Sequence, residues 1–539
     1  MSKILFNGKV YLDRGEFREA LLIEGDRIQA VGSNEEIRAL ASSDTEFIDC
    51  EGRTVIPGLN DSHMHFMQFG ETRNQAMIED VTSIDEMIEV CKRFANEHPQ
   101  SVKDGIHAIG WNQDNFRDSD RLPDRHDLDK ISTDIPIVLE RVCGHIVSTN
   151  SKLISMLDMS VFKEEDYMVG EDGEPNGIFK GNGTNLAKKI VPDFSMEERY
   201  RIMLEAMDYA AAHGLTSVQS NDIGTTFMDG PAAFDLLHRI YDSGKAKVRY
   251  RHQVCFNDFE AFQDYIENGE FAHKEELYPE GSWLTLGPLK LFKDGSLGAR
   301  TALVSGGYVD DRDNHGLEWM SNEDMDRYCA LAAKHGLQVV THAIGDEALS
   351  RTIDSYEKAF VDGKNKLRHV LNHVQITDPA LIKRIADLDI LTSVQPIFLD
   401  YDMRILNDLL GEELGATSYA WKSLSEAGVH VSYGTDCPVE DCNPFPNIYC
   451  AVTRKNKAGS PEGGFNPQEC VDVETAIDAY TTGSAYNEFM EEEKGRLRAG
   501  FYADLVVLDK DIFTVDPEEI SSILPVLTMV GGRIVYRRA

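Results

Sequence analysis

The chain has 539 residues, a length that predicts two or three domains. Of these residues 42% are hydrophobic and 27% are charged, a composition typical of a globular enzyme. Lys and Arg total 54 against 92 Asp and Glu, which gives a formal net charge of −38. Because that charge would repel a polyanion, it argues against nucleic acid and against an anionic membrane as partners.

Short strands and turns are predicted at both ends of the chain. Residues 6–11 and 20–28 have the pattern of hairpin arms around Asn-Gly and Gly-Asp turns. Residues 503–536 have the same pattern of short strands and turns. Each end alone offers too few strands to bury a core. We therefore expect residues 1–57 and 492–539 to form one composite β-sandwich, with the middle of the chain inserted between them.

The middle of the chain, residues 58–491, alternates helical and strand-like patterns. The clearest helix–strand units lie at residues 198–219, 325–342, 381–395 and 423–434. Repeated units of this kind build parallel sheets, and their number favours an α/β fold of the (β/α)₈ TIM-barrel type. A doubly wound open sheet is the alternative, but no G-x-G-x-x-G or P-loop motif indicates nucleotide binding.

The stretch from about residue 73 to 184 fits this rhythm poorly. It contains Pro123, Pro136 and Pro175 and the aromatic-rich run 109–116. We expect it to be an insertion that shapes the substrate site after the first barrel strand.

The sharpest local signal is the segment from Val55 to His65. Residues two apart in a strand face the same side, so His63 and His65 would point together into the barrel. Two imidazoles on one face are a natural pair of ligands for a divalent metal, although an isolated H-x-H is a weak signal. The turn at Pro57-Gly58 strengthens it, because the sandwich would pass into the barrel there.

Further candidate ligands lie where later predicted strands end. His342, His373 and Asp436 each occupy such a position. Barrel enzymes carry their chemistry on the rim formed by the C-terminal strand ends, so residues distant in sequence can converge there. A single histidine is more often a hydrogen-bonded structural residue, but four histidines and one aspartate at equivalent strand ends favour a metal site.

A lysine completes the set. If Leu289 and Leu291 face the outer helices, Lys290 points inward, and a buried lysine without a partner is costly. An inward Lys290 therefore indicates a ligand or reacting group, and Lys293, on the loop side, is the weaker candidate. The alternative is a lysine that reaches solvent at the strand end.

Together these residues resemble the amidohydrolase superfamily, and more narrowly the amidohydrolase family 3 or YtcJ-like group, which includes the N-substituted formamide deformylases. The resemblance covers nearly the whole chain. The motifs that carry it are 55–65, Trp111-Asn112-Gln113, Arg121-Leu122-Pro123, Gly144-His145, 289–302, 342–346, Val394-Gln395-Pro396 and 434–440.

The resemblance implies a distorted (β/α)₈ barrel with a composite sandwich, and a hydrolase of C–N bonds other than peptide bonds. His63 and His65 would hold a first metal and His342 and His373 a second, with Lys290, carboxylated by CO₂, between them. Asp436 would ligate the metal and take a proton from the attacking water. One or two Zn²⁺ ions are expected, with Mn, Fe or Co as alternatives.

Other residues are candidates for the substrate site. His145 is a candidate to hold the substrate carbonyl, with a structural role as the alternative. Trp111, Phe116 and Phe398 are candidates to line an apolar pocket, although core packing is the usual role of such rings. Asp294 is a further candidate substrate contact. The chain departs from the group at positions that bear on substrate choice. These are Asn372, where Glu is common, Cys437, where Ala or Ser is common, and Gly181-Asn182, near which a glutamate is common.

The expected function is hydrolysis of an amide, formamide or cyclic amide bond of a small molecule by metal-activated water. A heterocycle deaminase that releases ammonia stays open, as does an inactive regulatory or binding protein on the same fold. The nine cysteines are scattered and never spaced as C-x-x-C, and no signal-peptide pattern or apolar run of about 18 residues is found. We therefore expect a reduced, cytoplasmic setting, and a homodimer stays open.

Overall fold

The computed structural model describes residues 2–79, 81–117, 121–143, 145–224, 228–256 and 258–538. Contacts divide the chain into two compact units, residues 1–66 with 204–539 and residues 67–203. Within the described residues, every helix is too short or too polar to cross a membrane.

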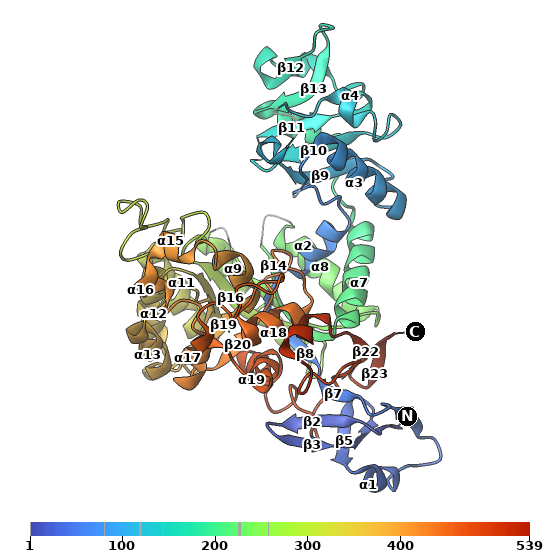
Figure 1. Ribbon diagram of the computed structural model, residues 1–539, viewed down its shortest axis with the longest axis vertical. Coiled ribbons are helices and arrows are strands. Elements are labelled where there is room, and N and C mark those ends of the chain that lie inside the picture. The colour runs from blue at the N-terminus through green and yellow to red at the C-terminus, as the bar shows by residue number, and fades with distance from the viewer. Residues whose placement is uncertain are drawn as a thin grey trace. The chain divides into compact units, whose positions relative to one another are not determined.

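The centre of the first unit is a sheet of eight strands whose neighbours all run parallel (Figure 1). In spatial order they are β8 (Leu59–Met64), β14 (Leu215–Ile223), β15 (Arg249–Val254), β16 (Leu284–Phe292), β17 (Val339–Ala343), β18 (Val370–His373), β19 (Leu391–Val394) and β20 (Val431–Tyr433). The end strands β8 and β20 contact each other, so the sheet curves round on itself. The prediction of a (β/α)₈ barrel is confirmed.

Helices follow the barrel strands from β14 onward. They are α8 (Gly230–Asp242), α9 (Phe259–Glu267), α11 (Asn322–Lys334), α12 (Asp346–Ala359), α13 (Pro379–Asp387), α17 (Trp421–Glu426) and α18 (Pro444–Thr453). Their starts are specified locally. For α13, the Asp378 side chain accepts a hydrogen bond from Leu381 N–H, and Pro379 occupies the first turn, where no backbone donor is needed.

Strands from the two ends of the chain build the composite sandwich. One sheet has the order β5-β4-β1-β6 and the other β23-β22-β21-β7-β2-β3. Their bounds are β1 (Ser2–Phe6), β2 (Lys9–Asp13), β3 (Glu16–Arg18), β4 (Ala20–Glu24), β5 (Arg27–Gly32), β6 (Glu46–Asp49), β7 (Thr54–Pro57), β21 (Leu505–Leu508), β22 (Pro525–Val530) and β23 (Arg533–Arg537). Strand β7 pairs antiparallel with β21, and Leu5, Ile23, Leu505 and Met529 share one core.

One predicted hairpin is wrong. The turn at Gly25-Asp26 does join the antiparallel strands β4 and β5, but Asn7-Gly8 does not close a hairpin. Strand β1 pairs with β4 and β6, whereas β2 pairs with β3 and β7 in the other sheet. Asn7, at φ 55°, therefore redirects the chain from one sheet to the other, because a left-handed residue sets a change of direction but not the pairing partner.

The second unit, residues 67–203, has its own five-stranded sheet in the order β12-β13-β11-β10-β9. Its elements include β9 (Ile106–Trp111), β10 (Ile137–Arg141), β11 (Ile146–Thr149), β12 (Tyr167–Val169), β13 (Pro175–Lys180), α3 (Ile84–Glu97), α4 (Arg125–Leu128) and α6 (Asn182–Lys188). The buried side of α3, with Met87 and Cys91, packs in a core with Ile106 and Leu139. The stretch expected as an insertion, 73–184, falls inside this unit.

Candidate metal centre

A buried cluster lies where barrel strands end in the first unit. Ligand atoms of His63, His373 and Asp436 all lie within 4.8 Å of one another. The ring of His63 is 5.5 Å from that of His65 and 5.3 Å from that of His373, and the rings of His342 and His373 are 4.3 Å apart. The structure therefore brings together all four histidines and the aspartate that the sequence nominated.

The backbone at these positions is shaped for the cluster. His373 and Asp436 have φ values of 77° and 55°, a region that residues with a side chain rarely adopt. Gly434 passes so close to β8 that a Cβ there would lie 2.6 Å from the His63 backbone nitrogen. Asp61 accepts hydrogen bonds from the Thr435 backbone N–H (3.1 Å) and hydroxyl (2.6 Å), which fastens the loop carrying Asp436 to β8.

In three histidines, a hydrogen-bond partner that can only accept determines which ring nitrogen carries the proton. His65 donates from Nδ1 to the Asn221 carbonyl (2.7 Å), and His342 donates from Nε2 to the Gly295 carbonyl (3.0 Å). His373 donates from Nδ1 to Oε1 of Gln395 (2.7 Å). The other nitrogen of each neutral ring therefore carries a lone pair.

The cluster fits a bound cation. Nε2 of His65 lies 3.2 Å from Oδ1 of Asp436, and Nε2 of His63 lies 3.3 Å from the same oxygen. Two acceptors facing each other repel, so His65 and Asp436 are compatible at this distance when a positive charge lies among them. Nε2 of His373 and Oδ1 of Asp436 are buried without a hydrogen-bond partner among the described residues. These orphaned atoms are the ones a metal would use.

Lys290 points inward, as its alternation with Leu289 and Leu291 predicts. Its side chain is buried, and its Nζ lies 3.3 Å from Nε2 of His63. Burial lowers the pKa of Lys290 to about 7. Burial also lowers the pKa of His63, to about 3. Burial by itself would raise the pKa of Asp436, but His63 and His65, which can donate to it as protonated rings when no metal is bound, outweigh burial and hold that pKa well below its usual range. The same contact with Asp436 outweighs burial and raises the pKa of His65.

Aromatic rings flank the cluster in the first unit. Phe398, nominated from sequence, lies parallel to His373, with 6.2 Å between ring centroids. Trp319 lies parallel to His342 at 6.4 Å, and Phe292 contacts both of these rings. Sequence reasoning missed Trp319, Phe292, Asn221 and Gln395 as parts of this site. A lone tryptophan in a long loop has no periodic pattern, whereas Gln395 directly follows the last residue of β19 within the motif Val394-Gln395-Pro396.

Asp294 does not have the position of a substrate contact, and this expectation is corrected. Its carboxylate is fully buried and accepts three backbone hydrogen bonds, from Leu303 (2.8 Å), Ile344 (3.0 Å) and Gly345 (2.8 Å). Burial raises its pKa to about 7 despite these bonds. Asp294 thus holds the loop after β16 against the end of β17, because its oxygens are engaged by the chain.

Three nominated residues belong to the second unit. Trp111 is fully buried, stacks with Phe116 at 6.5 Å, and donates its indole N–H to the Leu139 carbonyl (2.9 Å). Packing therefore accounts for both rings without a substrate. His145 is exposed before β11, where it stays a candidate.

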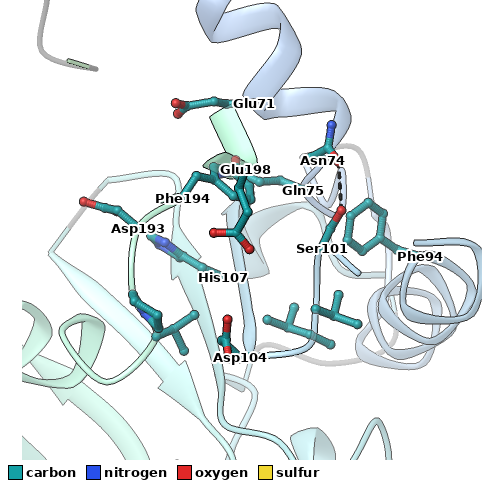
Figure 2. Close-up of a pocket in the computed structure, with 15 residues that line it drawn as sticks. Glu71, Asn74, Gln75, Phe94, Ser101, Asp104, His107, Asp193, Phe194 and Glu198 are labelled. Carbon is teal, nitrogen blue, oxygen red and sulfur yellow. Dashed lines mark hydrogen bonds between the residues drawn. The ribbon is translucent and has the colours of Figure 1, made fainter. Parts of the chain in front are cut away.

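The second unit also encloses a cavity of its own, shown in Figure 2 with Glu71, Asn74, Ser101, His107 and Glu198 among its lining residues. Ser101 donates to Oδ1 of Asn74 (2.8 Å), the dashed line of Figure 2. Two of its carboxylates are neutralised by neighbouring cations: Glu71 pairs with Arg199 (2.6 Å) and Glu198 with Lys103 (3.0 Å). The cavity thus differs from the barrel cluster, where the acceptor atoms are left unpaired.

Comparison with known proteins gives a consistent result along the chain. A model of the amidohydrolase family matches residues 46–536. YtcJ of Bacillus subtilis (strain 168), which bears an amidohydrolase name, is 30% identical over 546 residues that span 100% of both chains. The N-substituted formamide deformylase of Arthrobacter pascens is 25% identical over 97% of this chain and 96% of its own. An uncharacterized metal-dependent hydrolase from Pyrococcus furiosus superposes with a TM-score of 0.76 at 27% identity, covering 95% of this chain and 100% of that one.

Proposed function

We propose that this chain, which belongs to the amidohydrolase family, hydrolyses a C–N bond of a small molecule, an amide, formamide or cyclic amide, with water activated at a divalent metal. Family membership makes it a metal-dependent hydrolase, and the bond, the metal and the residue roles are the proposal. The similarity to an N-substituted formamide deformylase over nearly the full length supports formamides as the first substrates to test.

A single observation carries the proposal. Hydrogen bonds to Asn221, Gly295 and Gln395 leave three imidazoles with lone pairs beside a buried carboxylate. An arrangement with so many buried acceptors is costly unless a positive charge, a metal ion or a proton, lies among them. We propose His63, His65, His342, His373, Asp436 and Lys290 as the ligand set, with Lys290 carboxylated and zinc as the ion.

The bound ion would lower the pKa of a water molecule and polarise the substrate carbonyl. The chain itself supplies the proton transfer. The carboxylate of Asp436 lies buried within the cluster, where it would accept a proton from the attacking water and pass that proton to the leaving nitrogen. The side chain stays in place because its loop is fastened to β8 through Asp61 and Thr435.

The test is a substrate screen with zinc-loaded enzyme, using N-substituted formamides, cyclic amides and aminated heterocycles. Asp436→Asn should lower kcat/KM by at least about a hundredfold, because it removes the proton acceptor. Asp441→Asn, an exposed aspartate on the same loop, should leave the rate unchanged. Full turnover by Asp436→Asn would refute the assigned role.

The products decide which bond is cut. Release of an amine together with formate or another carboxylic acid supports the amidase. Release of ammonia from an aminated heterocycle supports the deaminase instead. Purified protein that contains no metal, and hydrolyses nothing after Zn²⁺ or Mn²⁺ is added, would leave the binding protein as the better explanation.

A further inference from the structure

Trp319 combines strong exposure with a fixed position. Its side chain is 61% exposed, although burying a tryptophan is strongly favourable. Its ring is nevertheless ordered against the cluster, at 2° from the plane of His342 and 6.1 Å from Phe292. A large apolar ring held in place beside an active centre is a surface that a ligand can cover.

The loop that carries Trp319 is built to hold it. The Trp319 backbone N–H donates to the Lys293 carbonyl (2.9 Å). The fully buried Lys293 ammonium donates to Glu318 Oε1 (2.7 Å) and to the Met320 carbonyl (2.8 Å), the residues on either side of Trp319. Arg351 binds the same Glu318 oxygen at 3.1 Å. The backbone that carries the ring is therefore held in place, which lowers the entropy lost when a ligand binds.

A second ring stands beside another candidate ligand. Phe398 is half-buried and lies parallel to His373, at 9° between ring planes. Since His342 and His373 are themselves 4.3 Å apart, Trp319, Phe292 and Phe398 line the histidine pair with apolar surface. Beside these rings, Lys290 and the imidazoles supply the polar groups of the site.

We propose that Trp319, Phe292 and Phe398 form an aromatic platform that binds a flat apolar group of the substrate, so that the preferred substrates carry an aromatic ring next to the scissile bond. This inference rests on the proposed function. Contacts between aromatic rings add binding free energy beyond that of the apolar area they bury. This additional free energy corresponds to roughly a two- to tenfold preference for an aromatic over an aliphatic group.

The experiment uses a matched pair of probes, N-benzylformamide and N-butylformamide, with zinc-loaded enzyme. Wild type should show a roughly two- to tenfold higher kcat/KM for the benzyl compound. Trp319→Ala should reduce that preference to near unity, mainly by raising KM for the benzyl probe, and Trp319→Phe should keep most of it. Trp283→Phe is the control, because Trp283 contacts Arg249 and Arg533 away from the cluster and its change should leave the preference intact.

A binding measurement separates this inference from the proposed function. Both probes are titrated into zinc-loaded Asp436→Asn enzyme by calorimetry, with and without Trp319→Ala. If wild type hydrolyses neither probe, formamides are excluded as substrates, and the titration alone decides. Tighter binding of the benzyl probe that disappears with Trp319→Ala supports the platform. Equal affinities, absent binding, or a preference that survives Trp319→Ala overturns it.

Discussion

At the scale of single residues, neutral partners fix the orientation of three histidine rings in the proposed metal site. The carbonyls of Asn221 and Gly295 and the amide oxygen of Gln395 accept hydrogen bonds but cannot donate them. They therefore select which ring nitrogen keeps its proton, and they fix the ring orientation as well. None of the three contributes a charge, so the negative charge of the cluster comes from Asp436.

Gln395 gives a residue-level prediction. Gln395→Leu should weaken zinc binding by roughly 10- to 100-fold, because His373 loses the partner that sets its tautomer and orientation. Competition with a chromogenic chelator measures this affinity without any substrate. Gln263→Leu, at an exposed position on α9, is the control. Equal affinities for wild type and Gln395→Leu would show that the hydrogen bond does not orient the ring.

At the scale of elements, neighbouring strands are held together by side chains as well as by the backbone hydrogen bonds between them. His369, just before β18, accepts a hydrogen bond at Nδ1 from Val339 N–H (3.0 Å) at the start of β17. This bond requires a neutral ring, and burial lowers the pKa of His369 to about 4. The beginning of the β17–β18 pair is therefore sensitive to acid.

Proton binding sets the direction in which the stability changes with pH. Between pH 6.5 and 4 the unfolded chain binds a proton at His369 that the folded chain does not, so this contribution to stability is complete above 6.5 and declines as the pH falls to 4. His369→Gln should reduce the slope of the free energy of unfolding against pH by about 1.4 kcal/mol per unit in that interval. Urea unfolding at several pH values measures the slope. The exposed His273→Gln should leave it unchanged, and an unaltered slope in His369→Gln would contradict the assignment.

At the scale of the whole first unit, a buried ion pair ties the barrel to the sandwich. Arg249 of β15 donates from Nε to Oδ2 of Asp504 (2.8 Å), beside β21. Asp504 also accepts from the Gly531 backbone N–H (2.7 Å), at the turn between β22 and β23. Both side chains are almost completely buried. One carboxylate thus joins a barrel strand to two strands of the C-terminal segment.

Removing that carboxylate should destabilise the unit strongly. Asp504→Ala leaves the Arg249 charge buried without its partner, which costs about 3–5 kcal/mol. The control is Asp509→Ala, because the pair of Asp509 with Arg538 is partly exposed and contributes about 1 kcal/mol or less. Chemical denaturation followed by circular dichroism compares the two. A loss for Asp504→Ala no larger than for Asp509→Ala would show that the pair does not couple barrel and sandwich.

Local patterns in the sequence were enough to predict the barrel, because the alternation of helix and strand patterns depends on neighbours in the chain. The same two-residue period placed Lys290 inward between Leu289 and Leu291. By contrast, the Asn7-Gly8 turn has the composition of a hairpin but joins two sheets, since strand pairing is decided by partners far along the chain.

The sequence by itself determined which residues could bind a metal and that they lie at strand ends. Only the tertiary structure decided that His63 meets His373 and Asp436, more than 300 residues later in the chain, within 4.8 Å, because this depends on how eight strands close into a barrel. It alone decided the histidine tautomers, which follow from the Asn221 carbonyl on β14, the Gly295 carbonyl after β16 and the Gln395 amide oxygen after β19. It also showed that Asp294 is occupied by backbone N–H groups while Trp319 is largely exposed, since loop residues have no period from which their surroundings can be inferred.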